Sequence, residues 1–83
     1  MIKVLSIQHI SDFQIELTFS NDEQGVFDAA SYLSQKTGSL LVPLRDANYF
    51  KRCFVEAGAI CWPNGLELSG ERLFELCQVL EAI

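Results

Sequence analysis

Residues 60–69 of this 83-residue chain constrain its fold more than any other stretch. They run from a short apolar segment through Trp62, which is the only tryptophan, into a Pro-Asn-Gly turn and on to Ser69. Asn and Gly are typical turn residues, and Gly65 tolerates the positive φ that such a turn needs. The stretch therefore predicts a strand, a tight turn at Asn64-Gly65 and the capped start of a helix.

The first third of the chain has the two-residue period of β-strands. Residues 12–20 alternate apolar and polar side chains, which is typical of a half-buried strand. Its apolar side consists of Phe13, Ile15, Leu17 and Phe19. Residues 2–10 form a preceding strand, with a turn at Ser11-Asp12, and residues 24–29 read as the returning strand. Together they predict a three-stranded antiparallel meander.

The middle of the chain is less regular. Residues 29–33 are compatible with a helical turn, and Pro43 interrupts the apolar run 40–44, so any strand there would lie at an edge. Asp46 is placed to cap a short helix over residues 47–52. Residues 54–56 and 59–62 flank Ala57-Gly58 and predict a second hairpin.

From Ser69 onward the apolar period changes to about 3.6 residues, which indicates an amphipathic helix. Ser69 is its expected N-cap, and Glu71 in the first turn complements the positive helix end. The expected apolar face consists of Leu73, Leu76, Cys77, Leu80 and Ile83, whereas Arg72, Glu75 and Gln78 point away from it. The predicted fold is a single α+β domain over residues 1–83: a meander plus a second hairpin, a short middle helix and this C-terminal amphipathic helix.

Composition excludes several classes of function. The net charge of -5 opposes direct binding to a nucleic-acid backbone. The apolar runs are far shorter than the ~20 residues that cross a bilayer, and the start of the chain lacks the apolar core of a signal peptide, so we expect a cytoplasmic protein without membrane contact. The hydrophobic content is 49%. A domain of this size buries only about 60% of its unfolded surface, so we expect dense packing or association, including a homodimer.

The cysteines do not form a recognisable metal or disulfide motif. Three cysteines cannot all pair within one chain, and reduced thiols are the simple expectation. Cys53, Cys61 and Cys77 with His9 match the ligand count of a Cys3His zinc site, but no two of them have the close spacing of such sites. We therefore expect no metal and no cofactor.

Catalytic groups are equally dispersed. A cysteine nucleophile needs a neighbouring imidazole, and the sequence does not by itself bring His9 to Cys61. Asp28, Asp46 and Glu67 are separate carboxylates, whereas acid-base work needs two in one pocket. No catalytic residue is predicted, and the chain is expected not to be an enzyme.

Trp62 has two alternative roles. It is either a core or rim anchor, whose large ring adds buried area to a small domain, or an exposed contact for a partner protein. On the second alternative the interaction candidates are Trp62, Asn64 and Glu67.

The chain resembles the bacterial family known as domain of unknown function 2442. The resemblance extends over nearly the whole chain and is carried above all by residues 60–65 with Leu68, and more weakly by residues 17–19, Phe27-Asp28, and residues 44–46 with Phe50. Glu67 stands where the family commonly has Asp. The resemblance implies a small α+β domain without an established activity, and a pairing with another small protein in a toxin-antitoxin-like arrangement.

Three functions follow as hypotheses. The leading one is a non-enzymatic protein-interaction or regulatory module that binds itself or a small partner protein through a sheet edge or the Trp62 turn. The second is a small enzyme or ligand binder using Cys61, His9 or Glu67. The third is a transcriptional or toxin-antitoxin-like regulator acting with a partner.

Overall fold

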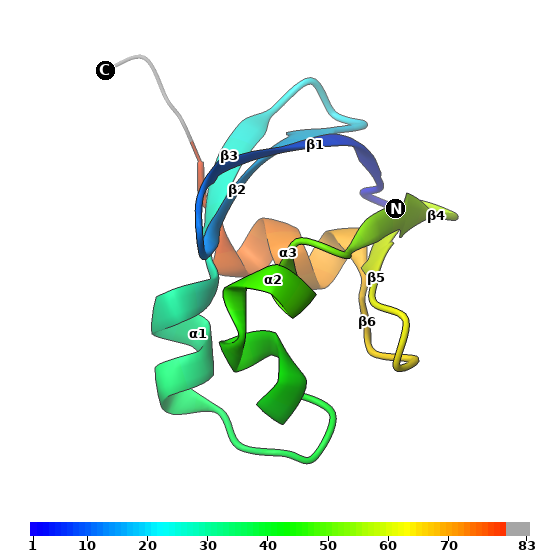
Figure 1. The fold of residues 1–83 in the computed structure, drawn as a ribbon. Helices are drawn as coiled ribbons and strands as arrows, with labels where there is room; N and C mark the ends of the chain where they lie inside the picture. Colours follow the sequence, from blue (N-terminus) through cyan, green and yellow to red (C-terminus); the bar gives the residue numbers. More distant parts are fainter. Residues whose placement is uncertain (80–83) are drawn as a thin grey trace.

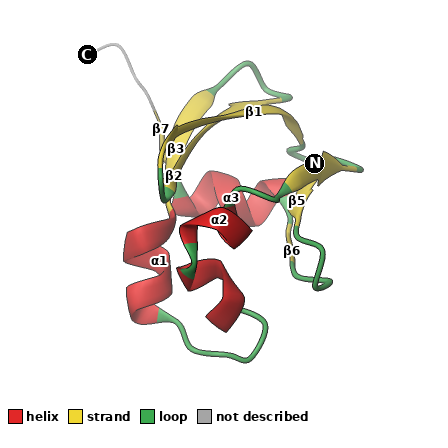
Figure 2. Ribbon diagram, viewed as in Figure 1, coloured by secondary structure: helices red, strands yellow, loops and turns green. Residues whose placement is uncertain are grey.

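Two small antiparallel sheets and a set of short helices build the fold in the computed structural model, which describes residues 1–79 (Figures 1 and 2). The first sheet has, in spatial order, β1 (Val4–Ser11), β2 (Gln14–Phe19), β3 (Gln24–Asp28) and β7 (Gln78–Val79). The second has β4 (Phe54–Glu56), β5 (Ala59–Cys61) and β6 (Glu67–Leu68). The helices are α1 (Ala29–Gln35), the 3-10 helix η1 (Val42–Arg45), α2 (Ala47–Phe50) and α3 (Gly70–Leu76). The predicted α+β class is confirmed.

The meander β1-β2-β3 forms as its alternation predicts. Ile15, Leu17 and Phe19 of β2 are fully buried, so the apolar side of this strand faces the core. The first turn differs by one residue from the prediction, because Ser11 still belongs to β1 and pairs with Gln14. The turn therefore lies at residues 12–13 rather than at Ser11-Asp12.

Aspartates cap both helices that follow the meander. Asp28 accepts a hydrogen bond from the backbone N–H of Ser31 (3.2 Å) and begins α1. Asp46 accepts one from the N–H of Asn48 (2.9 Å) and begins α2, which ends at Phe50 rather than at residue 52. Side-chain caps of this kind satisfy backbone donors that the first helical turn leaves free.

The apolar run 40–44 does not form an edge strand. It enters η1 instead, with Pro43 in the first turn, where the missing N–H of proline costs no helical hydrogen bond. Leu44 is buried and anchors this segment in the core.

The second hairpin is confirmed, and a third strand extends it. β4 and β5 are joined by Ala57 and Gly58, whose φ values of 53° and 81° are typical of a two-residue hairpin turn. β6, which sequence reasoning missed, pairs with the other side of β5. The carbonyl of Gly58 accepts a hydrogen bond from the N–H of Val4 (2.8 Å), which ties this hairpin to β1.

The C-terminal helix is shorter than predicted. Ser69 caps α3 by accepting from the N–H of Arg72 (3.1 Å), as expected, but the helix ends at Leu76. Residues 78–79 then form β7, which pairs with the open edge of β3, so the placement of Gln78 in the helix was wrong. β3 would otherwise lack a neighbour on this side, and its unpaired backbone groups favour a strand over another helical turn. Leu80 and Ile83 lie outside the described residues.

One core lies between the two sheets and the helices. Buried residues from β2, β3, α2, the end of β5 and α3 form a single cluster. Figure 1 shows the meander over the helices, with the second sheet beside the chain start. A Phe19–Phe74 edge contact, with ring centroids 5.3 Å apart, joins the meander to α3.

Gly70 gives the first test of this packing. A Cβ at this position would collide with the carbonyl oxygen of Ile2 and lie 2.8 Å from the Cα of Lys3. Gly70→Ala should therefore lower the free energy of unfolding by about 1–3 kcal/mol, although alanine is normally the better helix former. Urea denaturation followed by circular dichroism measures this. Gly38→Ala is the matched control, since the nearest atom there is 4.0 Å away. A Gly70→Ala variant as stable as the parent would contradict the packing of α3 on the N-terminal segment.

Candidate functional site

Trp62 is a core residue. Its ring is 1% exposed, and its indole N–H donates to the carbonyl oxygen of Phe50 at 3.0 Å. The centroids of the Trp62 and Phe50 rings are 5.8 Å apart, and the ring planes make an angle of 37°. This burial and this hydrogen bond agree with the role of Trp62 as a core anchor. A partner protein could contact the ring only if it left the core.

Asn64 holds the following turn together. Its side-chain Nδ2 donates to the carbonyl of Leu40 (2.9 Å), and its Oδ1 accepts from the N–H of Leu66 (3.1 Å). Gly65 has a φ of 92°, as predicted for the tip of the turn. Both ends of the Asn64 amide are thus engaged within the chain, which fastens the loop before η1 to the strand turn.

Two of the three cysteines each contact a polar side chain that the sequence did not indicate as a neighbour. The Sγ of Cys61 lies 4.0 Å from a carboxylate oxygen of Glu67 on β6, because the two residues are cross-strand neighbours. The Nε2 of His9 lies 3.6 Å from the Sγ of Cys53. The contact of His9 is therefore with Cys53, a residue 44 positions away whose role no local signal could reveal.

The electrostatics of these groups do not favour a thiolate nucleophile. Burial raises the pKa of Cys53 to about 11. Burial and then the Coulombic effects of Glu67 and Glu56 raise the pKa of Cys61. Burial, and then the nearby charge of Lys51, lower the pKa of His9. A neutral thiol beside a neutral imidazole is the expected state, whereas nucleophilic cysteines need a lowered pKa.

The described part of the chain contains no cluster of side chains that could form a metal centre. Within residues 1–79, no group of three or more His, Cys, Asp or Glu side chains is arranged to hold an ion. The three cysteines are free thiols.

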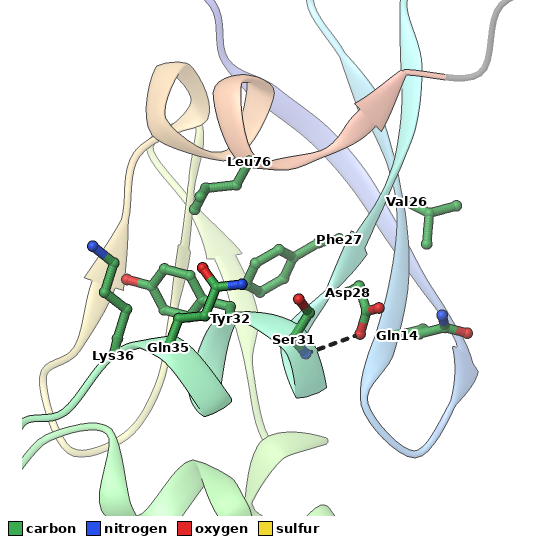
Figure 3. Close-up of a pocket in the computed structure, with 9 residues that line it drawn as sticks. All are labelled: Gln14, Val26, Phe27, Asp28, Ser31, Tyr32, Gln35, Lys36 and Leu76. Atoms are coloured by element: carbon green, nitrogen blue, oxygen red, sulfur yellow. Dashed lines mark hydrogen bonds between the residues drawn. The ribbon is translucent and has the colours of Figure 1, made fainter.

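A partly open pocket of about 420 Å³ lies between α1, the end of β3 and the end of α3 (Figure 3). Phe27 and Tyr32 form part of its wall, with ring centroids 5.6 Å apart, and Leu76 of α3 lies on the opposite side. The remaining lining residues are Gln14, Val26, Asp28, Ser31, Gln35 and Lys36. Sequence reasoning missed this pocket, because its walls come from elements far apart in the chain.

The second candidate surface is the outer side of β1, which we call the β1 edge and define by Leu5, Ser6, Gln8 and Ile10. β1 is the first strand in the sheet order, so its second side has no strand neighbour in the described structure. Its pairing with β2 shifts register between Val4 and Ser6 and between His9 and Ser11. Leu5 and Ile10 occupy these two irregularities and are 60% and 49% exposed. A simple alternation of apolar residues could not predict this, because bulges change which way a side chain points.

A comparison with models of known protein families identifies the family of this chain. A family model described as "Protein of unknown function (DUF2442)" matches residues 4–78. The chain belongs to this family. A search of curated proteins and a search of solved structures found no match. The resemblance inferred from residues 60–65 is confirmed, and the match extends from β1 to the first residue of β7.

None of the helices within residues 1–79 combines the length and apolar character needed to cross a bilayer.

The role of Trp62 leads to a stability prediction. Trp62→Phe leaves a cavity and removes the donor to the Phe50 carbonyl, so the free energy of unfolding should fall by about 2–4 kcal/mol. Urea denaturation followed by circular dichroism measures it, with Phe54→Leu at a partly exposed position as the control that should change little. A Trp62→Phe protein with unchanged stability would contradict the anchoring role.

Cys77 leads to a pH prediction. Burial raises the pKa of its thiol from 9.0 to about 12. Because the folded state holds this proton more tightly, the associated stability is fully present below pH 9.0 and is lost as pH rises toward 12. We expect the free energy of unfolding to fall over this range, and to fall less in Cys77→Val, since the other titrating groups are common to both proteins. Equal pH slopes in the two proteins would contradict the assignment.

Proposed function

We propose that this protein is a non-enzymatic interaction module that binds an extended segment of another polypeptide along the β1 edge. A second copy of the chain is the simplest such partner, and a small partner protein is the other. The supporting observation is an uncharged edge strand that leaves two large apolar side chains in solvent.

The composition of β1 is unusual for an edge. Its eight residues include no Lys, Arg, Asp, Glu or Pro. Folded proteins commonly protect their edges with charged residues or proline, because unpaired N–H and C=O groups otherwise attract another strand. A strand of this length without such protection supports pairing as its role.

The geometry of β1 supports a short pairing. Bulges can themselves turn an edge away from a partner. Here both register shifts lie outside residues 6–9, which pair regularly with β2. The edge near Val4 is already occupied by the hairpin through Gly58. A partner strand would therefore align with residues 6–9, with Leu5 and Ile10 adding apolar contact at its ends.

The enzyme alternative has less support. Cys61, His9 and Glu67 belong to two separate contacts, and the two thiols concerned have raised pKa values. The regulator alternative is compatible with the β1 edge, since such a regulator also needs a partner protein.

The proposal leads to a test by substitution. In Leu5→Lys/Ile10→Lys, two exposed apolar side chains become charged, which should disrupt pairing while leaving the core intact. Size-exclusion chromatography with light scattering over a wide concentration range measures self-association. We expect the parent protein to dimerise and the double variant to remain monomeric.

Val42→Lys is the matched control, because Val42 is 59% exposed but lies in η1, away from β1. It should associate like the parent, and thermal unfolding checks that all variants fold. Association that persists in the double variant would contradict the proposal, as would a parent that stays monomeric and binds no small partner protein.

A further inference from the structure

The pocket between α1 and α3 carries hydrogen-bonding groups that the fold does not use. No hydrogen bond or ion pair links the polar ends of Tyr32, Gln35 or Lys36 to another residue within 1–79. Asp28 uses one carboxylate oxygen, Oδ1, to cap α1. Among the described residues, the pocket is therefore lined by available donors and by one carboxylate with a free oxygen.

Opposite charges lie at the two ends of this pocket. Figure 3 shows Asp28 at one end with Ser31 and Gln14, and Lys36 at the other with the hydroxyl of Tyr32, while the Gln35 amide lies between them. Asp28 is the N-cap and Lys36 the C-cap of α1, so the backbone positions of the two charged residues are fixed relative to one helix. The eight residue steps between them correspond to about 12 Å along the helix axis at ~1.5 Å per residue.

The spacing suits a ligand with two separated charges. An extended chain spans about 3.3–3.6 Å per residue, so a tripeptide places its ammonium and carboxylate groups about 10 Å apart. A single amino acid is too short to reach both ends. The pocket volume of about 420 Å³ is within the ordinary range for small-ligand sites.

We propose that this pocket binds a short peptide with free termini, its ammonium group at Asp28 and its carboxylate at Lys36 and Tyr32. The amide of Gln35 is placed to bind the peptide groups between the two ends, whereas the amide of Gln14 lies at the Asp28 end, where its Oε1 already accepts a hydrogen bond from Ser11. The rings of Phe27 and Tyr32 and the side chain of Leu76 offer apolar contact to its side chains. This site is independent of the β1 edge, which lies at the far end of the sheet order from β7.

A titration with trialanine tests the proposal. Two-dimensional ¹H–¹⁵N NMR of the full chain reports the side-chain amides of Gln14 and Gln35 and the backbone amides of Ser31 and Lys36. These signals should shift saturably. N-acetyl-trialanine amide, which lacks both charges, should bind about ninefold more weakly, as expected for the loss of two partly solvated ion pairs. Added salt should weaken binding of trialanine and leave the blocked peptide unaffected.

Two variants assign the charges. Asp28→Ser keeps a side-chain acceptor that can cap α1 but removes the charge, and Lys36→Gln removes the other charge. Each should weaken trialanine binding by about threefold without changing thermal stability. Lys51→Gln makes the same substitution at a lysine paired with Asp12 outside the pocket and should have no effect on binding. Shifts that map elsewhere, equal binding of the blocked peptide, or an absence of any shift would each overturn the proposal.

Discussion

The packing of Phe50 holds the parts of this molecule together. Its ring contacts His9 and Phe13 from the meander, with centroids 5.9 Å and 5.7 Å away, and Trp62, which directly follows β5 of the second sheet. Its carbonyl also accepts the indole hydrogen bond of Trp62. A chain of this size buries a smaller fraction of its unfolded surface than a larger domain does, so both sheets must share one core. Phe50, at the end of the four-residue helix α2, is where they meet.

This shared core decides which residues remain available for function. Trp62 is enclosed by it, Asn64 fastens a loop to it, and the three thiols lie in or beside it with raised pKa values. The features left over lie at the periphery, at opposite ends of the first sheet: an uncharged edge strand and a polar pocket. Our two proposals place the binding of polypeptide at these two features.

Local sequence signals predicted the local structure well. The alternation in β2, the capping side chains of Asp46 and Ser69 and the turn at Gly65 depend on residues close together in the chain, and each formed as expected. The strands β6 and β7 were missed, because two-residue strands exist only where a neighbouring edge offers hydrogen bonds. The end of α3 was misplaced for the same reason, since the helical period continues in the sequence past Leu76.

Residue types and short spacings along the chain were enough to predict the fold class, the family and the dispersal of ionisable groups. Three features came from the three-dimensional fold alone: His9 contacts Cys53 rather than Cys61, Leu5 and Ile10 are exposed at bulges, and α1 and α3 enclose a pocket. Each of these depends on contacts between segments distant in sequence. Such contacts are set by how the shared core packs, and no local pattern records them.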